Sequence, residues 1–166
     1  MSRDLANVVV VVMGVSGSGK TTVGALLAER LGVEYAEADA FHPQANIDKM
    51  ASGVPLNDED RAPWLAAIAE WIRARAGHGG VVSSSALKRR YRDVLRAAGD
   101  VRFLHLNGSR EVIAARLAGR SGHFMPESLL DSQFEALEPL SDDEAGVIVD
   151  VTETPEQIVA TALREL

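Results

Sequence analysis

The chain has 166 residues, 46% of them hydrophobic and 25% charged, a balance that indicates one globular domain with a single core. Its net charge of −7 argues against a nucleic-acid partner, and the absence of cysteine excludes disulfides and thiolate chemistry. The longest apolar run, residues 8–13, is too short to span a bilayer, and the N-terminus has no signal-peptide pattern. We therefore expect a cytoplasmic protein without a membrane partner.

Apolar runs alternate with amphipathic stretches along the chain. Five short runs predict strands, over residues 8–13, 33–38, 81–83, 101–106 and 146–151. The stretches between and after them predict helices, over residues 20–31, 46–52, 57–76, 86–98, 110–120 and 155–166. This order predicts a three-layer α/β/α sandwich with a central five-stranded parallel sheet. In such a sheet the site lies beyond the carboxyl ends of the strands.

A glycine-rich stretch follows the first predicted strand. Residues 14–21 read Gly-Val-Ser-Gly-Ser-Gly-Lys-Thr and fit the P-loop pattern G-x-x-x-x-G-K-[ST]. Its glycines let backbone N–H groups converge on phosphate oxygens, Lys20 reaches the β- and γ-phosphates of ATP, and the Thr21 hydroxyl ligates Mg²⁺. The residues expected to bind the nucleotide are Gly14, Ser16, Gly17, Ser18, Gly19, Lys20, Thr21 and Thr22.

Other features of the sequence show which class of P-loop protein to expect. No lysine follows Asn or Thr, so the [NT]-K-x-D pattern of GTPases is absent, and the chain is short for a motor ATPase. The sandwich is therefore expected to be of the P-loop NTPase type, and a small-molecule P-loop kinase remains as the expected function.

Polar residues also follow the second predicted strand. Asp39 is placed to accept the proton of the acceptor hydroxyl as the phosphoryl group arrives. The alternative is that Asp39 caps the next helix. His42 fits capping or packing as well as a contact with the acceptor.

The third strand leads into a helix that Ser84 or Ser85 is predicted to cap, with Ala86 as its first residue. Lys88 would then meet the positive end of the helix dipole, with Arg92 one turn later on the same face. Two unfavourable charges at one helix start predict an anion between them, either the γ-phosphate or an acceptor carboxylate. The guanidinium fork of Arg92 suits a carboxylate. A solvated basic face is the alternative.

After the fourth strand, Arg116 and Arg120 lie four residues apart on one predicted helical face. They indicate a helical lid, over about residues 116–137, that excludes water and brings arginines to the transferring group. Ordinary surface ion pairs are the alternative. The acidic stretch 138–144 is expected to be exposed, and the loop 152–155 is where such folds hold adenine.

Several stretches beyond the P-loop resemble the gluconate kinase family of the small thermoresistant type. They are residues 39–43 (DAFHP), 46–50 (NIDKM), 53–65 (GVPLNDEDRAPWL), 85–88 (SALK), 91–93 (YRD), 122–124 (GHF) and 132–135 (SQFE). The resemblance runs over about residues 8–151. It implies phosphoryl transfer from ATP-Mg²⁺ to the 6-hydroxyl of D-gluconate, and a homodimer.

The resemblance also implies which residues bind the acceptor and which take part in catalysis. An acceptor-binding helical segment is expected over about residues 40–76. The expected acceptor contacts are Asp39, His42, Arg61, Lys88, Arg92, His123 and Gln133. The expected catalytic residues are Lys20, Asp39, Lys88, Arg116 and Arg120.

Two other functions stay open at this point. A related kinase would take shikimate, a nucleoside monophosphate or another sugar acid, although the acids at 58–60 disfavour a second phosphate. A nucleotide-dependent regulator would keep the P-loop but would need neither Asp39 nor the pair Lys88 and Arg92. Lys49 lies within a family-like stretch, but the resemblance assigns it no role, and an ion pair with a nearby acid is the alternative.

Overall fold

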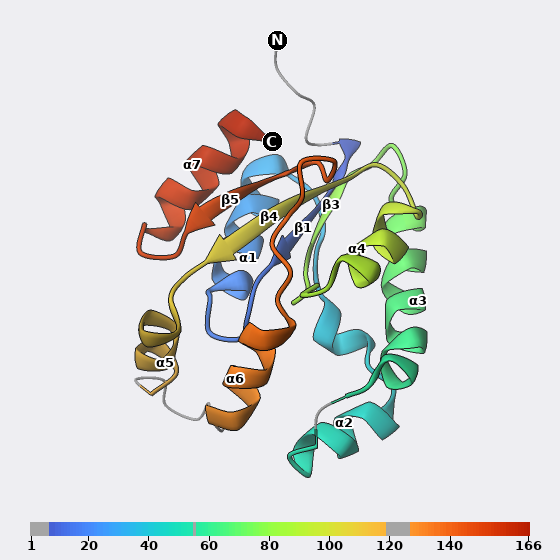
Figure 1. The fold of residues 1–166 in the computed structure, drawn as a ribbon. Helices are drawn as coiled ribbons and strands as arrows, with labels where there is room; N and C mark the ends of the chain where they lie inside the picture. The colour runs from blue at the N-terminus through green and yellow to red at the C-terminus, as the bar shows by residue number, and fades with distance from the viewer. Residues whose placement is uncertain (1–6, 55, 119–126) are drawn as a thin grey trace.

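Five parallel strands form the centre of the molecule. The structure, a computed structural model, describes residues 7–54, 56–118 and 127–166 (Figure 1). The strands are β1 (Val9–Met13), β2 (Tyr35–Glu37), β3 (Gly80–Ser83), β4 (Val101–Asn107) and β5 (Gly146–Asp150). They form one sheet in the order β2-β3-β1-β4-β5, and every neighbouring pair is parallel. The predicted five-stranded parallel sheet is confirmed.

Helices cover both faces of this sheet, as the alternating pattern predicted (Figure 1). They are α1 (Lys20–Leu31), α2 (Gln44–Ala51), α3 (Asp58–Ala74), α4 (Arg89–Arg96), α5 (Arg110–Ala118), α6 (Glu127–Ala136) and α7 (Pro155–Glu165). Helices α1 and α7 pack on the face that carries Val10 and Val12 of β1. Helices α3 and α4 pack on the opposite face, against Val9 and Val11. Because β1 is buried on both sides, its run of valines needs no polar alternation.

Local sequence signals set the ends of several helices. Helix α1 has the predicted bounds, and Gly32 ends it in the left-handed conformation (φ 69°). Helix α3 begins after Asn57, whose side chain accepts from the backbone N–H of Asp60 in a capping box. Helix α6 lies within residues 116–137, where a helical lid was expected, although its bounds were not predicted. The segment that leads into it, residues 119–126, lies outside the described residues.

Helix α4 begins three residues later than its sequence predicts. Ala86 has a left-handed backbone (φ 43°), so the right-handed helix starts at Arg89 instead. Lys88 occupies the N-cap position, and no side chain caps the helix. The prediction that Ser84 or Ser85 caps it is therefore wrong.

Two further differences concern polar segments. β2 ends at Glu37, one residue early, because the chain turns into the 3-10 helix η2 (Ala38–Phe41), which carries Asp39. The stretch 138–144 is not exposed throughout, since only 4% of the surface of Glu144 is accessible. Within the described residues, no helix is both long and apolar enough to cross a bilayer.

His105 is a buried titratable group in the middle of β4. Only 2% of its surface is exposed, and its Nδ1 atom has no hydrogen-bond partner among the described residues. Burial, assisted by the nearby charge of Arg92, lowers the pKa of His105 to about 4. The folded protein therefore keeps this imidazole neutral at pH values where the unfolded chain protonates it.

This difference predicts an acid-sensitive stability. The contribution of His105 is complete above its unfolded pKa of about 6.5 and is lost as the pH falls toward 4, a change of roughly 3 kcal/mol in the free energy of unfolding. His105→Leu should remove most of this slope in urea unfolding between pH 4.5 and 6.5. His42, whose pKa burial also lowers, should leave a smaller slope. His78→Gln, at an exposed position, is the control. An unchanged slope in His105→Leu would contradict this explanation.

Candidate active site

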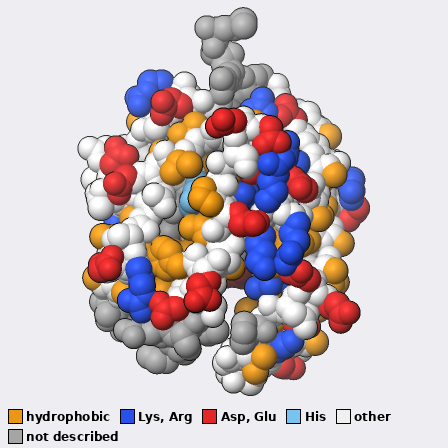
Figure 2. Space-filling view, viewed as in Figure 1, with side chains coloured by type: hydrophobic (Ala, Val, Ile, Leu, Met, Phe, Trp, Pro, Cys, Tyr) orange, Lys and Arg blue, Asp and Glu red, His pale blue; other side chains and the backbone are white. Residues whose placement is uncertain are grey.

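A cleft opens at the carboxyl ends of the strands. It has a volume of about 830 Å³, and Figure 2 shows the surface hollowed between α6 and α2 at this end of the molecule. Seven of the residues expected to form the site line it, and they are Ser16, Lys20, Thr21, Asp39, His42, Arg61 and Gln133. The serines after β3, residues 83–85, form another part of its wall. The structure thus brings the P-loop to one cavity with four of the residues expected to contact the acceptor, Asp39, His42, Arg61 and Gln133.

The P-loop needs its glycines for both conformation and space. Gly17 and Gly19 have positive φ values of 83° and 96°. A Cβ atom on Gly14 would lie 2.8 Å from the Leu106 carbonyl oxygen, and one on Gly17 would lie 2.8 Å from Cγ of Leu117. Side chains at these positions would therefore push the loop away from β4 and α5.

Polar groups of this loop fit the phosphates of ATP. Lys20 extends back over the loop, where its Nζ donates to the carbonyl oxygens of Gly14 and Val15 at 3.0 Å. The hydroxyl of Ser18 is buried and has no hydrogen-bond partner among the described residues. An unsatisfied buried hydroxyl beside a helix N-terminus is suited to a phosphate oxygen.

Thr21 is exposed in the first turn of α1 and lines the cleft, and its hydroxyl is of a kind that suits a metal ligand. The described residues contain no group of three or more His, Asp or Glu side chains that would hold a cation. Mg²⁺ would therefore depend on Thr21 and on phosphate oxygens, as it does in sites of this kind.

A second cavity, of about 390 Å³, lies on the other side of the P-loop. Its lining includes Gly17, Ser18, Gly19, Thr22, Arg116, Val151, Glu153 and Pro155. The guanidinium of Arg116 donates to the Val151 carbonyl and so joins α5 to the end of β5. This places Arg116 beside the loop 152–155, where adenine was expected.

Asp39 lies on a turn whose backbone is held by a hydrogen bond from a side chain of α3. Trp64, which is 4% exposed, donates from Nε1 to the Ala38 carbonyl at 2.7 Å. The ring of His42 stacks on Trp64 with 4.5 Å between the centroids and 9° between the planes. Burial lowers the pKa of His42 in spite of the nearby Asp39, so this imidazole is neutral near pH 7. Asp39 itself remains exposed to the cleft.

The alternative in which Asp39 caps the next helix does not match the structure. Helix α2 starts at Gln44 with Pro43 in the cap position, and no side chain caps it. Packing of His42 was among the expected possibilities, but its partner Trp64 and the hydrogen bond from Trp64 to Ala38 were not predicted. The sequence did carry a signal for this hydrogen bond, since Trp64 stands in the apolar stripe of its helix. A buried indole N–H needs an acceptor.

Arg61 reaches the cleft from α3 and is held by Tyr91 of α4. Its Nη1 donates to the Tyr91 hydroxyl at 3.0 Å, and that hydroxyl donates to Asp58 at 2.7 Å. The Nζ of Lys88 lies 6.0 Å from the centre of the Tyr91 ring. Lys88 is therefore near this cluster but does not line the cleft.

Gln133 joins α6 to the P-loop. Its Oε1 accepts from the backbone N–H of Ser16 at 2.7 Å, and its Nε2 donates to the hydroxyl of Ser16 at 3.1 Å. Lys49 pairs with Asp60 at 2.6 Å, which is the simple ion pair considered above. Arg120 and His123 lie outside the described residues.

The prediction for Arg92 is wrong. Its side chain is fully buried and bonds to Glu144, with 2.6 Å between Nε and a carboxylate oxygen. Arg92 does not line the cleft, so it cannot hold an acceptor carboxylate there. The anion inferred from the charges of this helix exists, but for Arg92 it is a glutamate of the chain itself.

The sheet order, the P-loop and the shared cleft define the class of protein, a small-molecule P-loop kinase. The family model for shikimate kinase matches residues 16–166. A solved shikimate kinase from Aquifex aeolicus vf5 has the same fold, with a TM-score of 0.62 and 15% identity over 94% of each chain.

Closer similarity is found to the gluconokinases. The gluconokinase of Gluconobacter oxydans (strain 621H) is 50% identical over 159 residues, covering 93% of this chain and 88% of that protein. The thermoresistant gluconokinase of Escherichia coli (strain K12) is 43% identical, covering 92% and 90%. A crystal structure of a gluconokinase from Sinorhizobium meliloti 1021 superposes with a TM-score of 0.89 at 49% identity, covering 96% and 91%. The chain belongs to the gluconokinase family, as its motifs indicated.

The tether behind Asp39 can be tested without an activity assay. Trp64→Phe keeps an aromatic ring but leaves the Ala38 carbonyl without its donor. The free energy of unfolding should fall by about 1–3 kcal/mol, and the amides of residues 38–42 should exchange faster while β1 stays protected. Trp71→Phe, in the same helix, is the control for the lost ring volume. If both variants exchange alike over residues 38–42, the indole does not hold this turn.

Proposed function

We propose that this protein is a gluconokinase that transfers the γ-phosphoryl group of ATP to the 6-hydroxyl of D-gluconate, giving 6-phospho-D-gluconate and ADP. The observation that carries the proposal is the 50% identity with a gluconokinase over 93% of the chain. A cleft that joins the P-loop to a wall of polar side chains supports it, because phosphoryl transfer needs both substrates in one water-poor space.

The nucleotide would lie across the two cavities. Adenine would occupy the smaller one beside Arg116 and the loop after β5, and the phosphates would follow the P-loop toward the cleft. Lys20 would move from the carbonyls of Gly14 and Val15 to the β- and γ-phosphates. Mg²⁺, held by Thr21 and the phosphates, would offset the charge that develops between the β- and γ-phosphates.

The acceptor would occupy the wall opposite the P-loop. Its 6-hydroxyl oxygen forms the new bond to phosphorus, the bond from phosphorus to the ADP oxygen breaks, and the hydroxyl proton passes to Asp39. His42 and Gln133 suit the other hydroxyl groups, since both side chains can donate or accept. With Arg92 buried elsewhere, we assign the gluconate carboxylate to Arg61, which lines the same cleft.

Several finer parts of the proposal rest on the family resemblance. They are a lid over about residues 116–137 with Arg120 and His123, a catalytic role for Lys88, a homodimer and a cytoplasmic location. An acceptor-binding role for the helical segment 40–76 also rests on the resemblance. His42 and Arg61 lie in this segment, and Asp39 directly precedes it.

A shikimate kinase is the second candidate, because the family model for that enzyme matches residues 16–166. The identities favour gluconate, since the solved shikimate kinase is 15% identical and the gluconokinases are 42–50% identical.

An acceptor panel decides between these candidates. In a coupled assay of ADP release with ATP and Mg²⁺, D-gluconate should support turnover, while shikimate and AMP should give only the background rate. Equal rates with every acceptor would refute the assignment of gluconate. Hydrolysis that ignores all acceptors would instead favour a nucleotide-dependent regulator.

Asp39 carries the chemical step in this proposal. Asp39→Asn should lower kcat by roughly 10²–10⁴-fold, since an amide cannot take the hydroxyl proton, while ATP still binds. Asp48→Asn is the matched control, because Asp48 is exposed on α2 and bonds only locally, to Gln44. A kcat near that of the wild type in Asp39→Asn would reduce Asp39 to a structural role.

A further inference from the structure

The turn between β3 and α4 has a strained backbone. Ala86 (φ 43°) is the one non-glycine residue with positive φ among those described. Such a conformation persists only where the surrounding structure holds it. The turn is also part of the cleft wall, to which Ser84, Ser85 and Leu87 contribute. The Ser85 carbonyl accepts from the backbone N–H of Gly14 at 3.3 Å, so the turn touches the P-loop as well.

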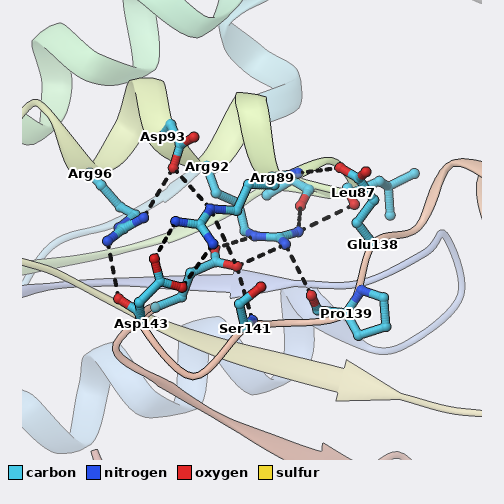
Figure 3. A network of polar contacts seen from close by, with 11 residues as sticks. Leu87, Arg89, Arg92, Asp93, Arg96, Glu138, Pro139, Ser141 and Asp143 are labelled. Atoms are coloured by element: carbon cyan, nitrogen blue, oxygen red, sulfur yellow. Dashed lines mark hydrogen bonds and ion pairs between the residues drawn. The ribbon is translucent and has the colours of Figure 1, made fainter.

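The guanidinium of Arg92 holds this turn from behind (Figure 3). Its Nη1 donates to the carbonyls of Ala86 and Leu87 at 2.9 and 3.2 Å. Its Nε and Nη2 donate to the two carboxylate oxygens of Glu144 at 2.6 and 3.1 Å, and Nη2 also donates to the Pro139 carbonyl at 3.3 Å. Each of the five N–H groups of the guanidinium therefore has an acceptor.

The other end of this network leads to α6. Glu144 is fully buried and also accepts from the backbone N–H of Ser141 at 3.1 Å. Burial alone would raise the pKa of Glu144, but the hydrogen bonds from Arg92 and Ser141 outweigh it, and the pKa lies below its usual value. The connection 137–145 bonds the turn directly as well, since the backbone N–H of Glu138 donates to the Leu87 carbonyl at 2.7 Å. Helix α6, which precedes this connection, carries Gln133 to the P-loop.

The stability of the fold alone does not explain why the buried ion pair of Arg92 and Glu144 occupies this position. Apolar residues of similar volume often replace a buried pair without loss, because the desolvation of both charges offsets their attraction. Apolar side chains, however, cannot donate to the two carbonyls of the turn. The pair therefore supplies directed hydrogen bonds at a place where the backbone needs them.

We infer that Arg92 and Glu144 are positioning residues for phosphoryl transfer: they hold the strained Ala86 turn against the connection from α6 and thereby fix one wall of the cleft. This inference rests on the proposed function as far as turnover is concerned. The bonds of the turn to Arg92 are independent of the substrate.

The first test compares two arginines of the same helix. Arg89 also bonds the connection, through Asp143, but its side chain is partly exposed and donates to no carbonyl of the turn. Figure 2 shows the exposed Lys and Arg side chains over α4 interspersed with acids. Arg92→Met should lower kcat about 10–100-fold with little change in the KM for ATP. Arg89→Met should keep the wild-type kcat. A folded Arg92→Met protein with wild-type kcat would overturn the inference.

The second test is a rescue. Glycine adopts the left-handed conformation without strain, so Ala86→Gly lets the turn keep its shape with fewer tethers. Ala86→Gly added to Arg92→Met should recover kcat by about fivefold or more. If Arg92 only stabilises the fold, Ala86→Gly should raise the fraction of folded protein without raising kcat per folded molecule. That result would also overturn the inference.

Amide exchange gives a readout without turnover. In Arg92→Met the amides of residues 84–88 should exchange faster than in Arg89→Met, while β1 and β4 stay protected. Equal exchange would overturn the inference even if the protein phosphorylates gluconate. Faster exchange would support it even if gluconate proves not to be the acceptor. If Arg92→Met does not fold, Glu144→Gln takes its place in every comparison, because the amide keeps the shape of the carboxylate.

Discussion

The turn from β1 into α1 is possible only because glycines stand where the backbone has positive φ or no room for a Cβ atom. This constraint places Lys20 and Thr21 in the first turn of α1, beyond the carboxyl end of the central strand β1. Because β3 pairs with β1 and β2 with β3, the ends of those strands lie beside the P-loop. The turn with Asp39 and the turn with Ala86 therefore share a cleft with the phosphate-binding loop, although they are far apart in sequence.

The segments that line the cleft opposite the P-loop are held by hydrogen bonds from side chains of α3 and α4. Trp64 bonds to the turn that carries Asp39, Tyr91 bonds to Arg61, and Arg92 bonds to the turn at Ala86. In each case a side chain from α3 or α4 donates to or accepts from a segment that lines the cleft. Such bonds matter for phosphoryl transfer, because a small displacement of a positioned group costs a large factor in rate.

Much of this architecture follows from local sequence patterns. The valine run of β1, the apolar stripe of α1 ended by Gly32, and the P-loop predicted their elements with correct or nearly correct bounds. The partner of Arg92 was not predictable in this way, because Glu144 lies 52 residues further along the chain, in a stretch that looked exposed. The late start of α4 was not predictable either, since Ala86 takes a conformation that its own sequence does not favour. Arg92 bonds the Ala86 carbonyl, and the distant Glu138 bonds the Leu87 carbonyl.

The chemistry of the cleft is tested most directly by the position of the phosphate in the product. The wild-type protein is incubated with ATP, Mg²⁺ and D-gluconate, and the purified product is examined by ¹³C and ³¹P nuclear magnetic resonance. A phosphate ester on carbon 6 alone is the expected result, because one terminal hydroxyl faces Asp39 and the γ-phosphate in the proposed arrangement. An ester on another carbon, or inorganic phosphate as the only product, would contradict this arrangement of the two substrates.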